Sequence, residues 1–155
     1  MSAKHAWHAR WAVKRDMPEI LDIDESSFER PWPEDEFLQI LSPRNCIAMV
    51  AENPEGRIVG YMVYRLHRHH VVLLKMAVAP DHRREGIGTV LIDALRAKLS
   101  GVRNRLYVDV PETSLDFQLL LRSCGIPCVN LVRGRNGCRD TLHFEDRLVE
   151  TGVTQ

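Results

Sequence analysis

The sequence predicts an α/β domain built on a mixed sheet, and three observations lead to this fold class. The chain has 155 residues, which is the length of one ordinary domain. Its composition, with 45% hydrophobic and 27% charged residues, is typical of globular proteins. Segments with the two-residue period of strands alternate with segments of helical period, in the order β-α-α-β-β-β-α-β-α-β-β. We therefore expect residues 1–155 to form a single domain.

Seven segments have the pattern of strands. The first is expected to place Trp7, Ala9 and Trp11 on one face. The segment 71–79 is almost continuously apolar, which predicts a strand that is buried on both faces. Turn residues at 53–56 and around 134–137 predict two hairpin connections. The predicted strands are 6–13, 45–52, 57–68, 71–79, 103–110, 127–133 and 139–148.

Four segments have the pattern of helices, each with a recognisable start or stop. Asp16 is a suitable N-cap for the first helix, and Pro33 suits the first turn of the second. Thr113 and Asp116 resemble a capping box for the fourth helix, which would stop at Gly125. The predicted helices are 16–28, 33–41, 86–99 and 113–123.

The charges of the chain cancel, but they are distributed unevenly. A net charge of zero argues against a strongly basic nucleic-acid-binding protein. Residues 16–64 carry a net charge of −8 and residues 65–105 a net charge of +6. This predicts an acidic and a basic surface that bind ligands of opposite charge, unless the two sets of charges mix on the folded surface.

Nothing in the sequence predicts a membrane protein or a secreted one. No apolar run approaches the ~20 residues of a membrane span. The first 15 residues contain four basic residues and lack the apolar region of a secretory signal. We expect a cytoplasmic protein, acting as a monomer or homodimer, that binds neither nucleic acid nor a membrane.

The four cysteines are expected to be reduced and to serve as small core side chains. Cys124, Cys128, Cys138 and His143 are the one combination that suggests a zinc site. Their spacing fits no standard paired motif, so we expect no metal. The histidines of the turn 65–70, of which His67 and His69 share a predicted face, are interpreted in the same way, as solvated polar residues.

The segment 76–89 contains the strongest functional signal. A buried strand ends there, and Gly86 and Gly88 open an amphipathic helix beside Arg83 and Arg84. The first N–H groups of a helix have no internal partner, and glycine lets an anion approach the backbone closely. This pattern predicts a phosphate or pyrophosphate site, although it matches neither the P-loop nor the dinucleotide fingerprint. The alternative is a tight turn with close packing of the helix against a strand.

The motif R83-x-x-G86-x-G88, after LLKMAVAP and before TVLIDAL, resembles the acetyl-CoA signature of the GNAT N-acetyltransferase superfamily. Within that superfamily the chain is most similar to the RimI-like ribosomal-protein-alanine N-acetyltransferases, on the segments 25–37 and 106–126. The resemblance implies a GNAT-like, mostly antiparallel sheet of about seven strands with helices on both faces. It also implies that the loop around Phe28 and Trp32 borders the acceptor groove.

The resemblance assigns residues to the cosubstrate acetyl-CoA. The main chain of 76–78 would pair with the pantetheine arm, and residues 84–89 would surround the pyrophosphate. Ser114 stands where the family has an asparagine. The residues expected to contact acetyl-CoA are Met76, Ala77, Val78, Arg83, Arg84, Glu85, Gly86, Ile87, Gly88, Thr89 and Ser114.

The resemblance also indicates the catalytic residues. Asp109 occupies the position of the family's proposed general base, a glutamate, and its alternative role is that of a polar strand residue. The tyrosine that would protonate the leaving thiolate is replaced by Leu121, which cannot donate a proton. Tyr107 points to the same face as Asp109 and is an alternative acid, unless it is a packing residue.

These signals predict an acetyl-CoA-dependent N-acetyltransferase that acts on a protein or peptide α-amine. Two alternatives stay open at this point. One is the same chemistry on a small amine such as a polyamine, an amino acid or a drug. The other is a coenzyme A-binding protein with weak or no catalysis, because of Leu121.

Overall fold

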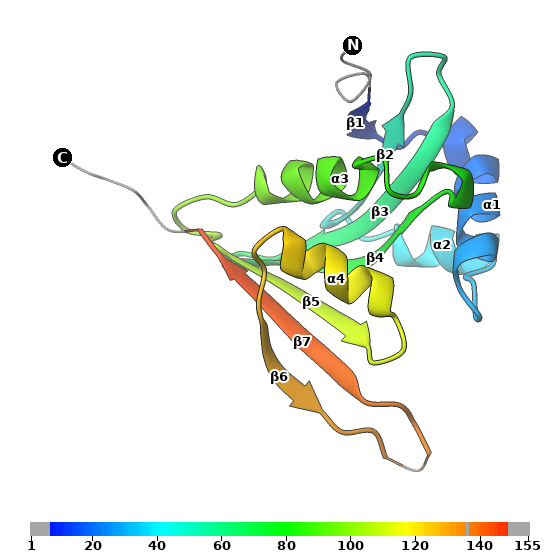
Figure 1. Ribbon diagram of the computed structural model, residues 1–155. Coiled ribbons are helices and arrows are strands. Elements are labelled where there is room, and N and C mark those ends of the chain that lie inside the picture. Colours follow the sequence, from blue (N-terminus) through cyan, green and yellow to red (C-terminus); the bar gives the residue numbers. More distant parts are fainter. Residues whose placement is uncertain (1–6, 136, 149–155) are drawn as a thin grey trace.

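The computed structural model describes residues 7–135 and 137–148, which form a seven-stranded sheet with four α-helices (Figure 1). The strand order is β1-β2-β3-β4-β5-β7-β6, and every neighbouring pair is antiparallel except β4 with β5. This confirms the predicted fold class and the predicted order of elements. The strands are β1 (His8–Trp11), β2 (Cys46–Glu52), β3 (Ile58–Leu66), β4 (His70–Val78), β5 (Arg105–Pro111), β6 (Cys128–Val132) and β7 (Thr141–Arg147). The helices are α1 (Met17–Ser27), α2 (Glu34–Ile40), α3 (Ile87–Arg96) and α4 (Leu115–Ser123).

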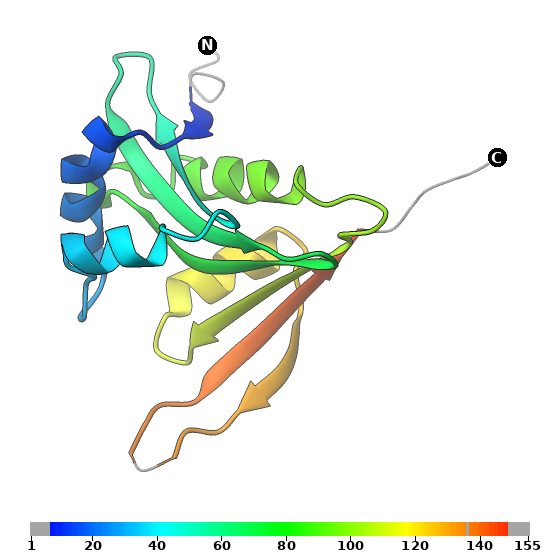
Figure 2. The same ribbon diagram turned by 180° about the vertical axis from the view of Figure 1, so that it is seen from behind.

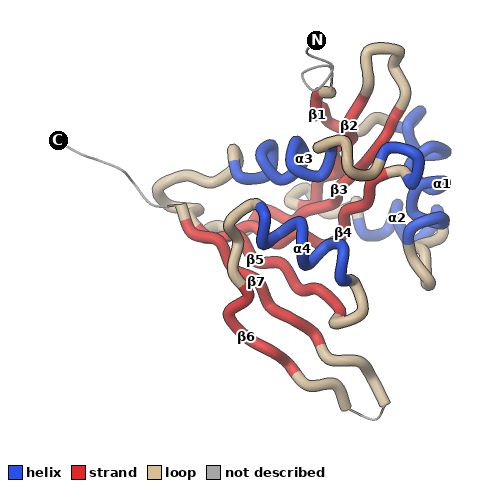
Figure 3. Tube along the Cα trace, in the orientation of Figure 1, coloured by secondary structure: helices blue, strands red, loops and turns tan. Residues whose placement is uncertain are grey.

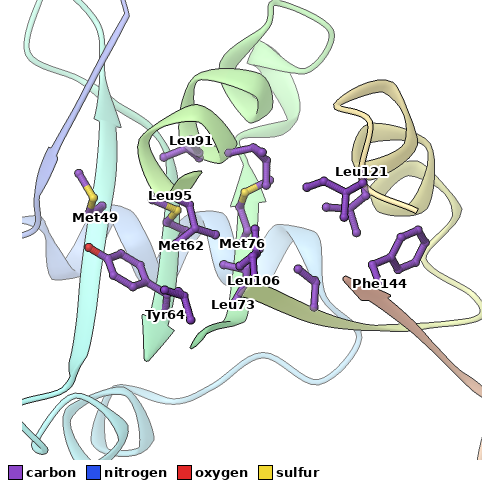
Figure 4. Packing of buried hydrophobic residues seen from close by; sticks show 14 of the residues in the cluster. Met49, Met62, Tyr64, Leu73, Met76, Leu91, Leu95, Leu106, Leu121 and Phe144 are labelled. Carbon is purple, nitrogen blue, oxygen red and sulfur yellow. The ribbon is translucent and has the colours of Figure 1, made fainter. Parts of the chain in front are cut away.

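Helices cover both faces of the sheet, as Figures 2 and 3 show. α3 and α4 pack on one face through the larger core cluster, which contains Leu91, Leu121 and Phe144 (Figure 4). α1 and α2 pack on the other face through a second cluster that includes Ile20 and Phe37. The central strand β4 supplies buried side chains to both clusters, as its continuous apolar sequence predicts. None of the helices within the described residues has the length and apolar character needed to cross a membrane.

Several sequence predictions are corrected at the ends of elements. The predicted strand 6–13 is reduced to β1, and residue 6 lies outside the described residues. Trp11 is 65% exposed because β1 is an edge strand. α4 begins after Ser114, so the capping box of Thr113 and Asp116 is wrong. The Thr113 hydroxyl instead accepts a hydrogen bond from Arg139, at 3.4 Å.

The cysteine prediction is correct in part. Cys46 is buried and Cys124 half-buried, but Cys128 and Cys138 are exposed, so these two are not core residues. All four thiols are free. In residues 7–135 and 137–148, no three His, Cys, Asp or Glu side chains come together in a way that could hold a metal ion.

An ion-pair cluster fixes β1 to the start of α1. The Arg10 guanidinium donates to both carboxylate oxygens of Asp16, at 2.8 and 2.9 Å, and to Glu52 Oε2 at 3.0 Å. Asp16 Oδ2 also accepts the main-chain N–H of Val13, at 2.7 Å. Its side chain is therefore occupied and does not cap α1, although Asp16 stands at the predicted N-cap position. Fixing β1 in this way completes the edge of the sheet.

Asp16 is expected to make the protein less stable in acid. The hydrogen bonds from Arg10 hold the pKa of the Asp16 carboxyl below its usual range. This pKa is lower in the folded chain than in the unfolded chain, where it is about 3.9. The carboxylate therefore stabilises the fold fully at a pH above about 3.9, and this stabilisation is lost as the pH falls through the pKa of the folded chain. Denaturant unfolding of the wild-type protein should give a lower unfolding free energy at about pH 3 than at about pH 7. The difference between the two pH values should be smaller in Asp16→Asn. An identical difference in the two proteins would contradict this account.

Candidate functional site

β4 and β5 diverge partway along their length, and the candidate site lies where they separate. Their parallel pairing runs from His70 with Arg105 to Leu73 with Val108. Beyond these pairs the described strands are no longer bonded to each other, and Figure 1 shows them spreading apart. We call the separated segments, residues 74–78 of β4 and 109–111 of β5, the β4–β5 splay. Met76, Ala77 and Val78 lie in it and pair only with β3, so one side of their main chain is available to a ligand.

A register shift in β4 coincides with the splay. Val63 of β3 pairs with Lys75, whereas the next residue, Tyr64, pairs with Leu73. Leu74 is therefore the extra residue of a β-bulge, which increases the local twist. The bulge explains how β4 can turn away from β5 while remaining bonded to β3.

The loop after β4 leads to an uncapped helix start. Gly86 is the N-cap residue of α3, its φ of +86° is in the left-handed region, and no side chain caps the helix. Arg84 is also left-handed, with a φ of +65°. The first turn of α3 contains no acidic residue, so its N–H groups and the positive end of the helix dipole are open to an anion. A Cβ atom at Gly86 would meet nothing within 4 Å, which leaves space for a phosphate group.

The other residues of this loop have different surroundings. Ile87 is buried in the core, so only its main chain can face a ligand, whereas Thr89 is exposed. A Cβ atom at Gly88 would lie 2.8 Å from Leu120 Cδ2 of α4, so Gly88 also has a packing role, against a helix rather than a strand. Glu85 Oε1 lies 3.4 Å from His82 Nδ1.

Arg83 connects this loop to α1. Its Nε donates to the carbonyl oxygen of Val78 at 3.2 Å, and its Nη2 donates to Ser27 Oγ at 3.2 Å. The guanidinium therefore joins the end of β4 to the end of α1. This contact places Arg83 beside the splay and gives it a structural role in addition to the predicted one.

Asp109 and Tyr107 share one face of β5, as the sequence predicts, and the structure shows that this face is turned away from α4. Asp109 is the first residue of β5 beyond the pairing with β4, and its side chain is 68% exposed. Its Oδ1 lies 2.6 Å from Nδ1 of His143, which is its register partner on β7. The Tyr107 ring packs between His70 and His143, with centroid distances of 4.9 and 5.4 Å.

The connection between α1 and α2 is anchored to the sheet by a buried carboxylate. Asp24 accepts the main-chain N–H of Trp32 at 2.7 Å and the hydroxyl of Tyr61. The Nζ of Lys75 lies 2.6 Å from Asp24 Oδ1, as an ion pair rather than a well-directed hydrogen bond. Burial lowers the pKa of Lys75, and the Asp24 carboxylate opposes that shift. Burial and the hydrogen bond to Asp24 raise the pKa of the Tyr61 hydroxyl, which therefore remains a neutral donor.

Aromatic rings enclose the same ammonium group. The Lys75 Nζ lies 4.2 Å from the ring centroid of Trp32 and 4.3 Å from that of Phe28. These cation–π contacts explain how a lysine is tolerated with 8% of its side chain exposed. They also hold the predicted acceptor-side loop against β4.

Comparison with known families decides the assignment. The model of the Acetyltransferase (GNAT) family matches residues 17–125. The chain belongs to this family. GNAT proteins are acetyltransferases that use acetyl-CoA. The search of curated proteins found no match.

Solved structures confirm the GNAT fold over nearly the whole chain. The ribosomal-protein-S18-alanine N-acetyltransferase of Escherichia coli is 19% identical, with a TM-score of 0.78 over 94% of this chain and 97% of that one. NAA60 of Arabidopsis thaliana, solved in complex with acetyl-CoA, is 15% identical, with a TM-score of 0.79 over 92% of this chain and 99% of that one. A spermidine N-acetyltransferase SpeG chimera from Vibrio cholerae and hSSAT is 14% identical, with a TM-score of 0.76 over 92% of this chain and 95% of that one. At these identities the likeness establishes the fold alone.

In this GNAT protein, Leu121 is a core residue. It is fully buried with Ile126 and Phe144, and Figure 4 shows it on the α4 side of the core. α4 thus presents no hydroxyl group at this position. Ser114, the N-cap residue of α4, is half-buried and its side chain makes no capping hydrogen bond, so its hydroxyl remains available near the end of β5.

The acidic and basic surfaces predicted from the sequence are not fully separate in the folded GNAT protein. Lys75 belongs to the basic segment, but it is buried against Asp24 of the acidic segment.

An apolar groove of about 630 Å³ between β1–β3 and the two helices α1 and α2 contains none of the predicted site residues. His67 and His69 lie in the turn between β3 and β4, as predicted, and the ring of His67 stacks on that of His70 with a centroid distance of 4.5 Å.

Proposed function

We propose that this GNAT protein transfers the acetyl group of acetyl-CoA to the N-terminal α-amine of a protein or peptide. The β4–β5 splay beside the uncapped start of α3 is the observation that carries the proposal. In it, the main chain of residues 76–78 pairs with the amide-rich pantetheine arm, and the N–H groups of residues 84–89 hold the pyrophosphate. Arg83 and Ser114 border this site. The proposal takes residues 1–155 as one cytoplasmic domain, acting as a monomer or homodimer.

The reaction sets three requirements for the protein. The amine nitrogen must be neutral to bond to the acetyl carbon while the carbon–sulfur bond breaks and its electron pair leaves with sulfur. A base must take the proton that the amine loses, and the sulfur must receive a proton. In this proposal Asp109 is the base, because it is exposed and lies directly beyond the last β4–β5 pair. Tyr107 is the alternative acid, and its packing between two histidine rings makes this the weaker assignment.

The choice of an α-amine rests on the acceptor side of the splay. The loop with Phe28 and Trp32 is anchored against β4, and the segment 25–37 carries the resemblance to RimI-like enzymes. One of the similar structures is named as an enzyme for the alanine of a ribosomal protein, and another as a spermidine acetyltransferase. A small amine is therefore the competing acceptor. Leu121 favours a second function, coenzyme A binding with little or no turnover.

Calorimetry with acetyl-CoA followed by a thiol-release assay tests the proposal. The acceptor panel contains peptides with free N-termini, the same peptides with acetylated N-termini, and small amines that include spermidine. We expect saturable binding of acetyl-CoA, and thiol release that requires the free α-amine. Turnover of small amines alone would favour the competing acceptor class. Binding without turnover would favour the second function, and no binding would exclude all three.

Asp109→Asn is expected to reduce kcat by about 100-fold, because the amide cannot accept the amine proton. The affinity for acetyl-CoA should not change, because Asp109 lies outside the predicted donor-binding residues. The loss should be largest near neutral pH, and it is measured as steady-state thiol release together with calorimetry. Glu112→Gln is a matched control, because it removes one exposed carboxylate from the same end of the sheet. Equal kcat values for Asp109→Asn and wild type would remove Asp109 from the mechanism.

A further inference from the structure

A group of four polar side chains occupies the face of β5 and β7 opposite α4. The antiparallel register pairs Asp109 with His143 and Tyr107 with Glu145. The residues that alternate with them, among them Val108 and Phe144, are buried in the same core cluster as α4. The four polar side chains therefore point to the other face, and Figure 2 shows that no helix crosses β5 and β7 there.

His143 is hydrogen-bonded to the proposed base through one defined nitrogen. Its Nδ1 lies 2.6 Å from Asp109 Oδ1, and its Nε2 lies 3.9 Å from Glu145 Oε1. Because Asp109 Oδ1 is a carboxylate oxygen, Nδ1 must be the donor, so neutral His143 carries its proton on Nδ1. The His143 side chain is only 25% exposed, whereas Asp109 is 68% exposed. The imidazole thus lies behind the carboxylate, and the carboxylate faces solvent.

The surroundings of His143 contain two carboxylates and one cation. On β5, Asp109 and Tyr107 face its ring. On β7, Glu145 faces it and pairs with Arg105 Nη1 of β5, at 3.6 Å. On β4, His70 contacts Tyr107 rather than His143, and its own neighbour is His67. The register partner on β6, Asn130, is uncharged. Asp109 is therefore the ionisable group in closest contact with the imidazole.

We propose that His143 is a positioning residue for Asp109 and makes the base depend on pH. This inference rests on the proposed function. Neutral His143 donates Nδ1–H to Oδ1, which fixes the carboxylate and leaves Oδ2 to take the proton that the acceptor amine loses. Protonation at Nε2 converts His143 into a cation, which stabilises the Asp109 carboxylate and weakens it as a base. Asp109 then accepts the amine proton efficiently only while His143 is neutral.

Two substitutions at position 143 separate the hydrogen bond from the titration. His143→Asn keeps an N–H donor at the place of Nδ1 but cannot be protonated, whereas His143→Leu has neither property. We expect His143→Leu to lose about tenfold in kcat, the equivalent of one hydrogen bond. His143→Asn should stay within about threefold of wild type at about pH 8. It should also lack the part of the decline in kcat at acid pH that wild type owes to protonation of His143. Acetyl-CoA affinity should be the same in all three proteins.

A merely structural role for His143 would leave the pH profile of His143→Asn identical to that of wild type, and this result would overturn the proposal. Unchanged kcat in His143→Leu would also overturn it. Nitrogen-15 NMR of the histidine side chains gives a readout that does not depend on turnover. We expect the Nδ1–H tautomer at His143 in wild type and its loss in Asp109→Ala. If wild type binds acetyl-CoA but acetylates no amine, the proposed function fails, and the tautomer still decides whether the pair exists. An Nε2–H tautomer in wild type would disprove the pair itself.

Discussion

Gly86→Glu is expected to weaken acetyl-CoA binding by about 100-fold or more while leaving the protein folded. Gly86 stands at the uncapped N-terminus of α3, and a Cβ atom there would point into open space. A glutamate side chain would bring its carboxylate to the place proposed for the pyrophosphate. Two like charges about 4 Å apart repel by about 4 kcal/mol at an effective dielectric constant of 20, and each 1.4 kcal/mol is a factor of ten in affinity. Calorimetry measures the loss directly.

Two control variants separate charge from backbone strain. Gly86→Gln has the same shape and the same left-handed backbone as Gly86→Glu but carries no charge, so it should retain much more affinity. Gly56→Glu places the same side chain on a residue with a φ of +82°, in the turn between β2 and β3. That position also has open space around a Cβ atom, so its conformational cost, about 1–3 kcal/mol, should match that of Gly86→Glu. Gly56→Glu should bind acetyl-CoA normally. Normal binding by Gly86→Glu would refute the assignment of the donor site.

Local signals in the sequence were sufficient to predict the turn that we propose as the donor site. Gly86 needs a left-handed backbone, and it lies between a buried strand and an amphipathic helix, so a few neighbouring residues define the turn. The fold class is predictable for the same reason, because the alternation of strand and helix periods is written along the chain. The ends of elements are less predictable. α4, for example, begins at Leu115 rather than at residue 113, and the Thr113 hydroxyl accepts a hydrogen bond from Arg139, which is distant in sequence.

The pairing of Asp109 with His143 could not be predicted from the sequence, because it depends on the register of two strands. In the sequence, His143 is only one member of a Cys/His combination whose spacing fits no zinc motif, yet its Nδ1 lies 2.6 Å from Asp109 Oδ1. The alternation of β5 and β7 predicts which face each residue takes, but it cannot say which residues stand opposite each other. A one-residue change of register would turn His143 into the core. The pair therefore follows from the whole hairpin and not from any short motif.

The contacts of Asp24, like those of His143, follow from the whole fold and not from any short motif. Replacing Asp24 is expected to have a large effect on stability. Asp24→Asn is expected to cost about 3–5 kcal/mol of unfolding free energy, because it leaves the Lys75 ammonium buried without a counter-charge. For a chain of this size the loss corresponds to a fall in Tm of roughly 10 °C. The variant also weakens the acceptor for Trp32 N–H and for the Tyr61 hydroxyl. Denaturant unfolding and thermal unfolding measure both quantities.

Asp22→Asn is the control for this prediction, because Asp22 lies on the same helix but is exposed. It should change the unfolding free energy by no more than about 0.5 kcal/mol. A double variant, Asp24→Asn with Lys75→Met, removes the buried charge as well and should recover part of the loss, since a neutral pair of similar volume needs no counter-ion. If Asp24→Asn were as stable as Asp22→Asn, the ion pair would not be what holds the α1–α2 loop to β4. In that case the cation–π contacts of Lys75 with Phe28 and Trp32 would have to hold the loop alone. The double variant, which lacks them, would then be less stable than Asp24→Asn.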